Sequence, residues 1–257
     1  MNSHMQPALQ DRVRPGPYRT TARVVGGVYL TGFVVGIGGE MLIQSTLGAP
    51  DPLATVSANR TLLAVGAILW LIAIAGDAAH GILMLPVLKP HSERLAFGYF
   101  GTRLIEAGLV AVMVLFVLVQ IPLSTAYLHA GASDTSQVHV LSTALMQAHR
   151  YAYHVGMIAL GFAGLLLCSL FFQATLVPRL LAVWGLIGYA TFLGGSVLAV
   201  LGLDLGLIHT IPGGLWEVFM GVWLIAKGFR AAAGPYEPTT SSMPLPTASP
   251  DAGSVAT

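Results

Sequence analysis

The chain has 257 residues, of which 55% are hydrophobic and only 9% are charged, and its formal net charge at pH 7 is +1. A soluble domain carries about a quarter charged residues, so this composition excludes an ordinary water-soluble protein. The small net charge gives no indication of a nucleic-acid partner. The single cysteine, Cys168, lies in an apolar run, where a buried thiol is expected.

Six hydrophobic segments follow one another along the chain, and each is close to the ~20 residues that cross a bilayer. They predict an all-α fold, a bundle of six transmembrane helices. The first segment follows a polar, arginine-containing lead without a small-residue cleavage site, so we expect a retained helix and not a removed signal peptide. The predicted spans are Ala22–Gln44, Leu62–Leu88, Phe97–Val119, Tyr151–Leu176, Leu180–Leu203 and Ile211–Phe229.

The ends of the chain differ in composition from the spans. Residues 1–20 are polar and residues 232–257 are rich in Pro, Ser and Thr, so we expect both ends to be disordered around a transmembrane domain at 21–231. One connection, Pro122–Arg150, is long. Helical spacing in its second half, SQVHVLSTALMQAHRYA, predicts an interfacial helix that leads into the fourth span.

Arginine and lysine gather on one side of the predicted membrane. Near the span ends, the side opposite the termini offers mainly Arg60 and Arg150. Because cytoplasmic loops carry the excess of Lys and Arg, both termini are predicted to be cytoplasmic. The residues on the side of the termini are Arg12, Arg14, Arg19, Arg23, Lys89, Arg94, Arg179 and Arg230.

Small residues predict where helix backbones approach closely. In the first span, Gly32 and Gly36 stand in the small-xxx-small relation that favours such contacts. The fifth span contains GLIGYATFLGG, which predicts the same kind of packing. No internal repeat is visible, so the inverted-repeat pattern of many transporters is missing from the sequence.

Several stretches resemble a family of bacterial integral membrane proteins that is described only as a domain of unknown function. The residues that carry the resemblance are LVPRLLAVWGLIGYATFLGG with IPGGLWEVFMGVWLIAKGFR near the end, TARVVGGVYL near the start, and TRLIEAGL in the third span. The resemblance covers about residues 20–230. It implies a multi-pass protein of a bacterial inner (cytoplasmic) membrane and carries no activity, cofactor or ligand with it.

Ionisable residues inside the spans are the unusual chemistry of this sequence. Asp77 and His80 lie in the second span, and Arg103 and Glu106 lie in the third. If these spans form an antiparallel hairpin, Asp77 and Glu106 are about 15 and 14 Å from its loop, and His80 and Arg103 about 10 Å. An i, i+3 spacing places each pair on one helix face, so the two pairs are predicted to meet.

This arrangement predicts an intramembrane cluster in which Arg103 neutralises a carboxylate through hydrogen bonds. With more than one acid for one arginine, we expect one acid to keep its proton and His80 to relay protons. The candidate catalytic residues are Asp77, His80, Arg103, Glu106 and Glu217. The alternative is that Arg103 and Asp77 form only a clasp that fixes the register of two helices.

A second polar group is expected toward the outer side. It comprises Glu40, His129, His139, His149, His154, Asp204 and His209, with Glu217 one to two turns inside the last span. Imidazoles and carboxylates can bind a metal, but the compact motifs of metal sites are missing, and His149 and His154 are about 140° apart on a helix, on different faces. We therefore predict no metal ligand, and haem only as an alternative, with His80 opposite a histidine of the fourth span.

The sequence predicts a membrane protein that binds a hydrophobic small molecule or lipid, with acid–base chemistry as an extension. The candidate ligand contacts are Glu40, Trp70, Tyr99, His149, His154 and Trp216. The alternatives are a proton-coupled transporter, a haem or metal protein, and a structural or regulatory protein without ligand. The sequence leaves the cofactor, the oligomeric state, the ligand and any reaction open.

Overall fold

The computed structural model describes residues 18–130, 132–203, 205–206 and 208–230. Its helices are α1 (Arg19–Leu47), α2 (Pro52–Ala58), α3 (Arg60–Leu88), α4 (Glu93–Leu118), α5 (Gln120–His129), α6 (Ala132–Gln173), α7 (Arg179–Val200), the 3₁₀ helix η1 (Ile208–Thr210) and α8 (Ile211–Ala226). Six segments are long and apolar enough to cross a membrane, where α5 extends α4 and η1 leads into α8. The predicted all-α architecture with six long apolar helices is therefore confirmed.

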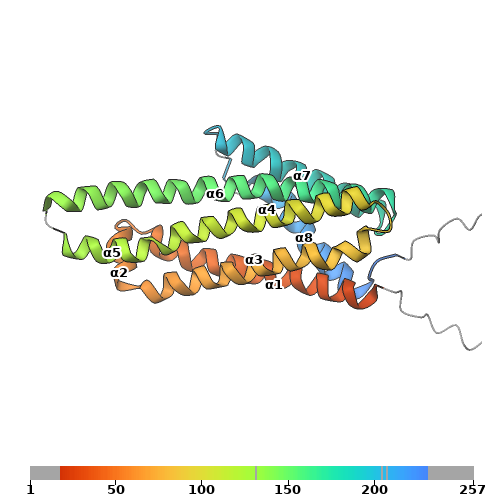
Figure 1. Cartoon of the computed structure of the whole chain (residues 1–257), viewed down its shortest axis with the longest axis horizontal. Helices are drawn as coiled ribbons and strands as arrows, with labels where there is room; N and C mark the ends of the chain where they lie inside the picture. Colours follow the sequence, from red (N-terminus) through yellow and green to blue (C-terminus); the bar gives the residue numbers. More distant parts are fainter. Residues whose placement is uncertain (1–17, 131, 204, 207, 231–257) are drawn as a thin grey trace, which may run out of the picture.

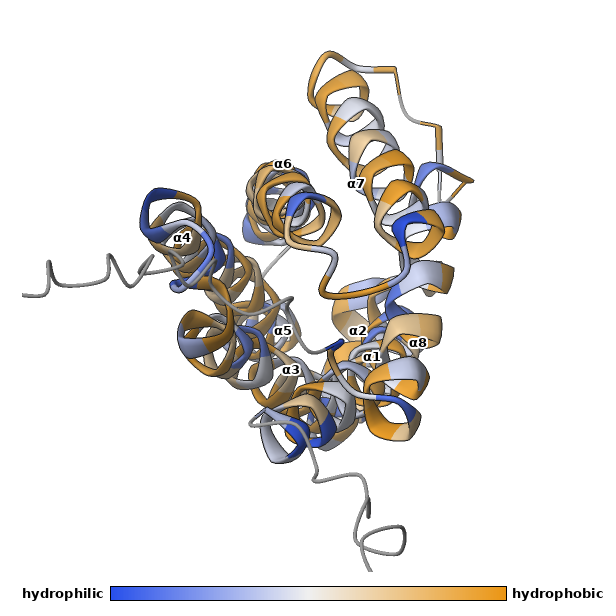
Figure 2. Cartoon of the chain, turned by 90° about the vertical axis from the view of Figure 1, so that its right-hand side faces the viewer, coloured by the Kyte–Doolittle hydropathy of each residue, from blue (hydrophilic) through white to orange (hydrophobic). Residues whose placement is uncertain are grey.

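The six long helices form a ring. Each packs against the next in the order α1, α3, α4, α6, α7 and α8, and α8 closes the ring on α1. Figure 2 shows this cyclic order when the bundle is viewed along its long axis. Many large apolar side chains remain exposed on the outside, among them Val34, Met41, Ile105, Ile187 and Val222, as expected for helices that face lipid.

Local sequence signals set the helix ends. Asp51 caps α2 by accepting a hydrogen bond from the backbone N–H of Ala54 at 3.1 Å, and Pro52 occupies the first turn. Ser92 caps α4 in the same way at 3.4 Å, directly after the short α3–α4 turn. The second and third spans are therefore an antiparallel hairpin, as predicted.

The long connection between the third and fourth spans is almost entirely helical. We predicted an interfacial helix ahead of the fourth span, but that segment belongs to the single 42-residue helix α6. Gln120 of α5 holds the two helices together: its side-chain N–H donates to the carbonyl oxygen of Ser142 at 3.2 Å, and its Oε1 accepts from Ser142 Oγ at 2.7 Å. The α2, α5 and early α6 segments form one end of the molecule (Figure 1).

The opposite end carries the start of α1, the α3–α4 turn, the α6–α7 turn and the end of α8 (Figure 1). A backbone hydrogen bond of 2.8 Å from Arg230 to Leu176 ties the residues after α8 to the α6–α7 turn. Arg19 and Thr20 already belong to α1. The rest of the N-terminal segment and the tail 232–257, both predicted to be disordered, lie outside the described residues.

Helix α1 approaches its neighbours closely at glycines other than the two that were predicted. Gly32 and Gly36 have no atom of another element within 4 Å of the position of a Cβ, so that prediction was wrong. Gly26 instead approaches Gly221 of α8, and Gly39 approaches Gly66 of α3. Gly26 and Gly39 are each buried where α1 crosses a neighbouring helix, α8 in one case and α3 in the other, whereas no neighbouring atom comes near Gly32 or Gly36.

Candidate functional site

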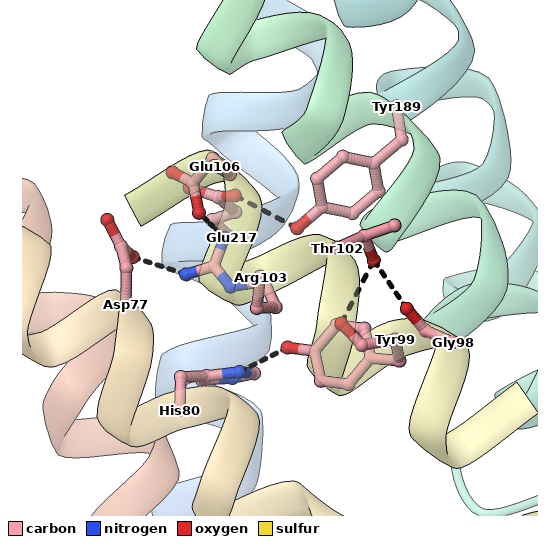
Figure 3. Close-up of polar contacts among 9 residues, drawn as sticks. All are labelled: Asp77, His80, Gly98, Tyr99, Thr102, Arg103, Glu106, Tyr189 and Glu217. Carbon is pink, nitrogen blue, oxygen red and sulfur yellow. Dashed lines mark hydrogen bonds and ion pairs between the residues drawn. The ribbon is translucent and has the colours of Figure 1, made fainter. Parts of the chain in front are cut away.

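Arg103 of α4 is the centre of a buried polar cluster. Its Nη2 donates to Asp77 Oδ1 of α3, and its Nη1 lies 3.1 Å from Glu106 Oε2, one turn along α4 (Figure 3). The side chains of Arg103 and Glu106 are only 7% and 2% exposed, whereas that of Asp77 is 36% exposed. The predicted meeting of the two helices through Arg103 and Asp77 is therefore present.

Gly81 makes this meeting possible. A Cβ at Gly81 of α3 would lie 3.2 Å from Cβ of Arg103, so the two helices are in near contact at this level. Any larger side chain at this position would push α3 away from α4 and lengthen the contact between Asp77 and Arg103.

Glu217 of α8 lies with this cluster, among the other candidate catalytic residues, although the sequence also grouped it with the outer polar residues. Its Oε1 accepts a hydrogen bond of 2.9 Å from the hydroxyl of Tyr189 of α7. Figure 3 shows its side chain beside those of Arg103 and Glu106. Helix α8 has only 16 residues, so a position six residues after its start is already near the middle of the membrane.

His80 and three aromatic side chains form the next layer toward the α3–α4 turn. His80 Nδ1 shares a hydrogen bond with the hydroxyl of Tyr99 (Figure 3), and its ring meets the ring of Tyr29 edge to face at 4.4 Å. Trp216, predicted as a ligand contact, is fully buried and donates to the carbonyl oxygen of Leu181 at 2.7 Å. Tyr99 and Trp216 therefore pack around the cluster.

The charges of this cluster do not balance. Three carboxyl groups, those of Asp77, Glu106 and Glu217, surround a single guanidinium group. An unpaired carboxylate in a low-dielectric interior is costly, by about 2.5–3.5 kcal/mol on insertion scales, so the cluster favours uptake of a proton or of another cation. Its residues provide the groups for acid–base chemistry, since each carboxyl has a hydroxyl or guanidinium partner that orients it.

A cavity of about 320 Å³ lies beyond the cluster, toward the α2–α5 end. Three helices each present one face to it, with residues at i, i+3, i+4 and i+7. These are Glu40, Ile43, Gln44 and Leu47 of α1; Met113, Phe116 and Val117 of α4, with Gln120 at the start of α5; and Met146, His149, Arg150, Tyr153 and His154 of α6. Gly48, which follows α1, and Trp70 of α3 complete the lining.

Four of the six predicted ligand contacts line this cavity, namely Glu40, Trp70, His149 and His154. Trp70 Nε1 donates to Glu40 Oε2 at 3.2 Å, which joins α3 to α1. His149 and His154 do point to different sides of α6, since His149 contacts α4 through Met113 and the His154 ring centroid lies 6.4 Å from that of His209, but both border the cavity. Arg150, Tyr153 and Gln120 also line the cavity and were not predicted, although the i, i+3, i+4 spacing along α6 could have found Arg150 and Tyr153.

His149 has a defined hydrogen-bonding role. Its Nδ1 lies 3.2 Å from the carbonyl oxygen of Met113 in α4. A carbonyl oxygen only accepts, so Nδ1 carries the proton and Nε2 is left as the acceptor of the neutral ring.

His209, predicted as part of the outer polar group, is buried. It is 6% exposed, its ring lies against Gly195 where a Cβ would be 2.2 Å from its Cγ, and its centroid is 6.4 Å from that of His154. Neither ring nitrogen of His209 makes a hydrogen bond to the described residues. Within those residues no group of three or more His, Cys, Asp or Glu side chains could hold a metal ion, and Asp204 lies outside them.

The cluster and the cavity are adjacent. Trp70 is seven residues before Asp77 and Met113 is seven after Glu106, so both α3 and α4 place the cavity about 10 Å from the cluster. A molecule in the cavity would therefore be within electrostatic reach of the cluster.

Comparison with known protein families tests the family resemblance that was found in the sequence. The family described as Domain of unknown function (DUF4386) matches residues 24–228, which is most of the chain. The chain belongs to the DUF4386 family. No curated protein and no solved structure matches it.

The DUF4386 match runs from the first turns of α1 to just beyond α8, so it includes every residue of the cluster and of the cavity. The family description names no activity. This DUF4386 chain is a multi-pass membrane protein with buried ionisable residues.

Proposed function

We propose that this protein binds an amphipathic small molecule or lipid within its transmembrane bundle, in the cavity between α1, α3, α4 and α6. One observation carries the proposal: four side chains singled out as ligand contacts, Glu40, Trp70, His149 and His154, come together at one cavity. Apolar walls with a few convergent polar groups are typical of small-molecule sites.

The membrane setting completes the proposal. Both termini are cytoplasmic, because the arginine- and lysine-rich end of the bundle holds the start of α1, the α3–α4 turn and the end of α8. The cavity then lies toward the outer side of a bacterial cytoplasmic membrane.

The test is native mass spectrometry of the protein extracted in a mild detergent. Met146→Trp should fill the cavity and remove a co-purified mass that the wild type retains. Leu141→Trp is the matched control, since Leu141 is 49% exposed on the same helix and does not line the cavity. A wild-type protein without any adduct, even after incubation with a total lipid extract, would overturn the proposal.

A second candidate function is acid–base chemistry at the cluster of Asp77, Arg103, Glu106 and Glu217. It is favoured by the surplus of carboxyl groups over guanidinium groups, which leaves at least one acid to hold a proton at neutral pH. The same surplus would serve a proton-coupled carrier. A clasp between two helices would need only Asp77 and Arg103.

Infrared spectroscopy distinguishes a cluster that holds a proton from a purely structural clasp, because a protonated carboxyl group and a carboxylate absorb at different frequencies. We expect a protonated-carboxyl band at neutral pH that disappears in Glu106→Gln or Glu217→Gln. Glu93→Gln is the control, since Glu93 lies on the surface and pairs only with Lys89 at 3.2 Å. If all carboxyl groups of the wild type are ionised, the proposal of acid–base chemistry is wrong, and the contact between Asp77 and Arg103 only holds α3 and α4 together.

A further inference from the structure

Two opposite charges border the cavity without neutralising each other. Glu40 of α1 and Arg150 of α6 both line it. Among the residues that the structure describes, neither forms an ion pair with the other or with a third side chain. The cavity is therefore bordered by one carboxylate and one guanidinium group that are too far apart to form a direct ion pair.

Glu40 is oriented by two neutral hydrogen-bond donors and has no cationic partner among the described residues. Trp70 Nε1 donates to its Oε2 at 3.2 Å, and Gln44 Nε2 donates to its Oε1 at 2.8 Å. Both donors are neutral, so they fix the orientation of the carboxylate and supply no counter-charge. A carboxylate oriented in this way is ready to bind a cationic group, and the indole of Trp70 adds a surface that attracts cations.

Arg150 provides the complementary partner. Its side chain is exposed at the edge of the cavity, and a guanidinium group binds phosphate or carboxylate groups through two parallel hydrogen bonds. It lies on the same face of α6 as His149, whose Nε2 is free to take part in a hydrogen bond to a polar ligand.

The depth of these groups matches a lipid headgroup. Glu40 lies 21 residues after the start of α1, or about 30 Å along the helix, and Trp70 lies 18 residues before the end of α3, or about 27 Å. Both helix ends belong to the same end of the bundle (Figure 1). The predicted first span ends at Gln44 and the fourth begins at Tyr151, so Glu40 and Arg150 lie within about 6 Å of the outer boundary of the hydrocarbon layer, where headgroups begin.

The rest of the lining is suited to hydrocarbon. Ile43, Leu47, Phe116, Val117 and Met146 form the apolar wall between α1, α4 and α6. Helices α7 and α8 contribute no residue to it. In Figure 1, α7 ends well short of the α2–α5 end, so at this level the wall of the bundle is formed by α1, α3, α4 and α6 alone.

We infer that the cavity takes a zwitterionic amphiphile, with a primary ammonium on Glu40, an anionic group on Arg150 and the start of an acyl chain against Ile43, Phe116 and Val117. This inference rests on the function proposed above and names its ligand class. A primary ammonium is favoured over a trimethylated one because it donates hydrogen bonds to the carboxylate, which a trimethylammonium group does not. Phosphatidylethanolamine and its relatives have this chemistry.

The experiment titrates delipidated, detergent-purified full-length protein with phosphatidylethanolamine, phosphatidylcholine and phosphatidylglycerol of one acyl composition, with native mass spectrometry as the readout. Phosphatidylethanolamine should bind at least about tenfold more tightly than the other two, as expected for one added charge-assisted hydrogen bond. Glu40→Gln should remove this preference and leave phosphatidylglycerol binding unchanged. Arg150→Gln should weaken all three lipids, because all carry a phosphate.

Matched controls are Glu93→Gln and Arg60→Gln, exposed residues away from the cavity lining, which should leave every affinity unchanged. Equal binding of the three lipids, or a preference that survives in Glu40→Gln, would overturn the inference while the proposed function stands. Absence of binding by any lipid would overturn the proposed function itself. Water-soluble phosphoethanolamine is the last arm: displacement of the lipid at equal concentration would overturn the amphiphile and identify a soluble zwitterion.

Discussion

Arg103 is the residue on which the buried cluster depends most directly. It contacts two carboxylates from a position where its side chain is 7% exposed, and the guanidinium group contacts both at once. Removing one partner of a buried ion pair leaves an uncompensated charge, which is far more costly than removing a pair at the surface. The stability of this protein should therefore be sensitive to this one side chain.

We expect Arg103→Met to lower the free energy of unfolding by about 3–5 kcal/mol, because Asp77 and Glu106 lose their counter-charge. Lys89→Met is the control, since Lys89 and Glu93 form an exposed i, i+4 pair, and should cost less than about 0.5 kcal/mol. Denaturant titration of both variants in one detergent measures the difference. Similar losses in the two variants would mean that the cluster adds no stability of its own.

At the scale of the elements, glycines set how closely the helices pack. Gly164 of α6 lies against the ring of Tyr189 of α7, and a Cβ there would be 2.0 Å from the Cγ of that ring. Tyr189 in turn donates to Glu217. The absence of a side chain at one position of α6 therefore determines where a cluster residue of α8 finds its hydrogen bond.

Gly164→Ala should destabilise the protein by about 1–3 kcal/mol, because the added methyl group forces Tyr189 and α7 to move. Gly101→Ala in α4 is the matched change, with nothing within 4 Å of its Cβ position. It should be neutral or stabilising by up to about 1 kcal/mol, since alanine is the better helix former. Thermal unfolding in detergent compares the two, and an equal effect would contradict the packing described for α6 and α7.

At the scale of the whole molecule, the ring of helices separates two polar sites by depth. The cluster lies near the middle of the bundle, and the cavity lies at the end that carries α2 and α5. The arginine- and lysine-rich turns are at the opposite end. The orientation in the membrane therefore decides whether the cavity meets the outer or the cytoplasmic leaflet.

Single cysteines test this orientation. His91 in the α3–α4 turn and Leu128 in α5 are exposed at opposite ends of the bundle, and the native Cys168 is fully buried. In whole cells, an impermeant maleimide should label Leu128→Cys and leave His91→Cys unlabelled until the membrane is permeabilised. The reverse pattern would place the termini and the cavity on the opposite sides from those proposed.

The sequence by itself determined the number of membrane helices, the α3–α4 hairpin and the contact of Arg103 with Asp77. These depend on local properties: the length of an apolar run, the cap at Ser92, and the i, i+3 spacing of charges on two segments joined by a short turn. It also placed Glu40, Trp70, His149 and His154 in one predicted group of ligand contacts, together with Tyr99 and Trp216, which do not line the cavity.

Only the tertiary structure decided that α8 closes the ring on α1, and that Glu217 therefore reaches Tyr189 and the neighbourhood of Arg103. It also decided that Gly26 and Gly39, and not Gly32 and Gly36, form the close contacts of α1. The physical reason is that composition and periodicity define a helix and its faces, whereas the partner of each face depends on side chains far away in the sequence.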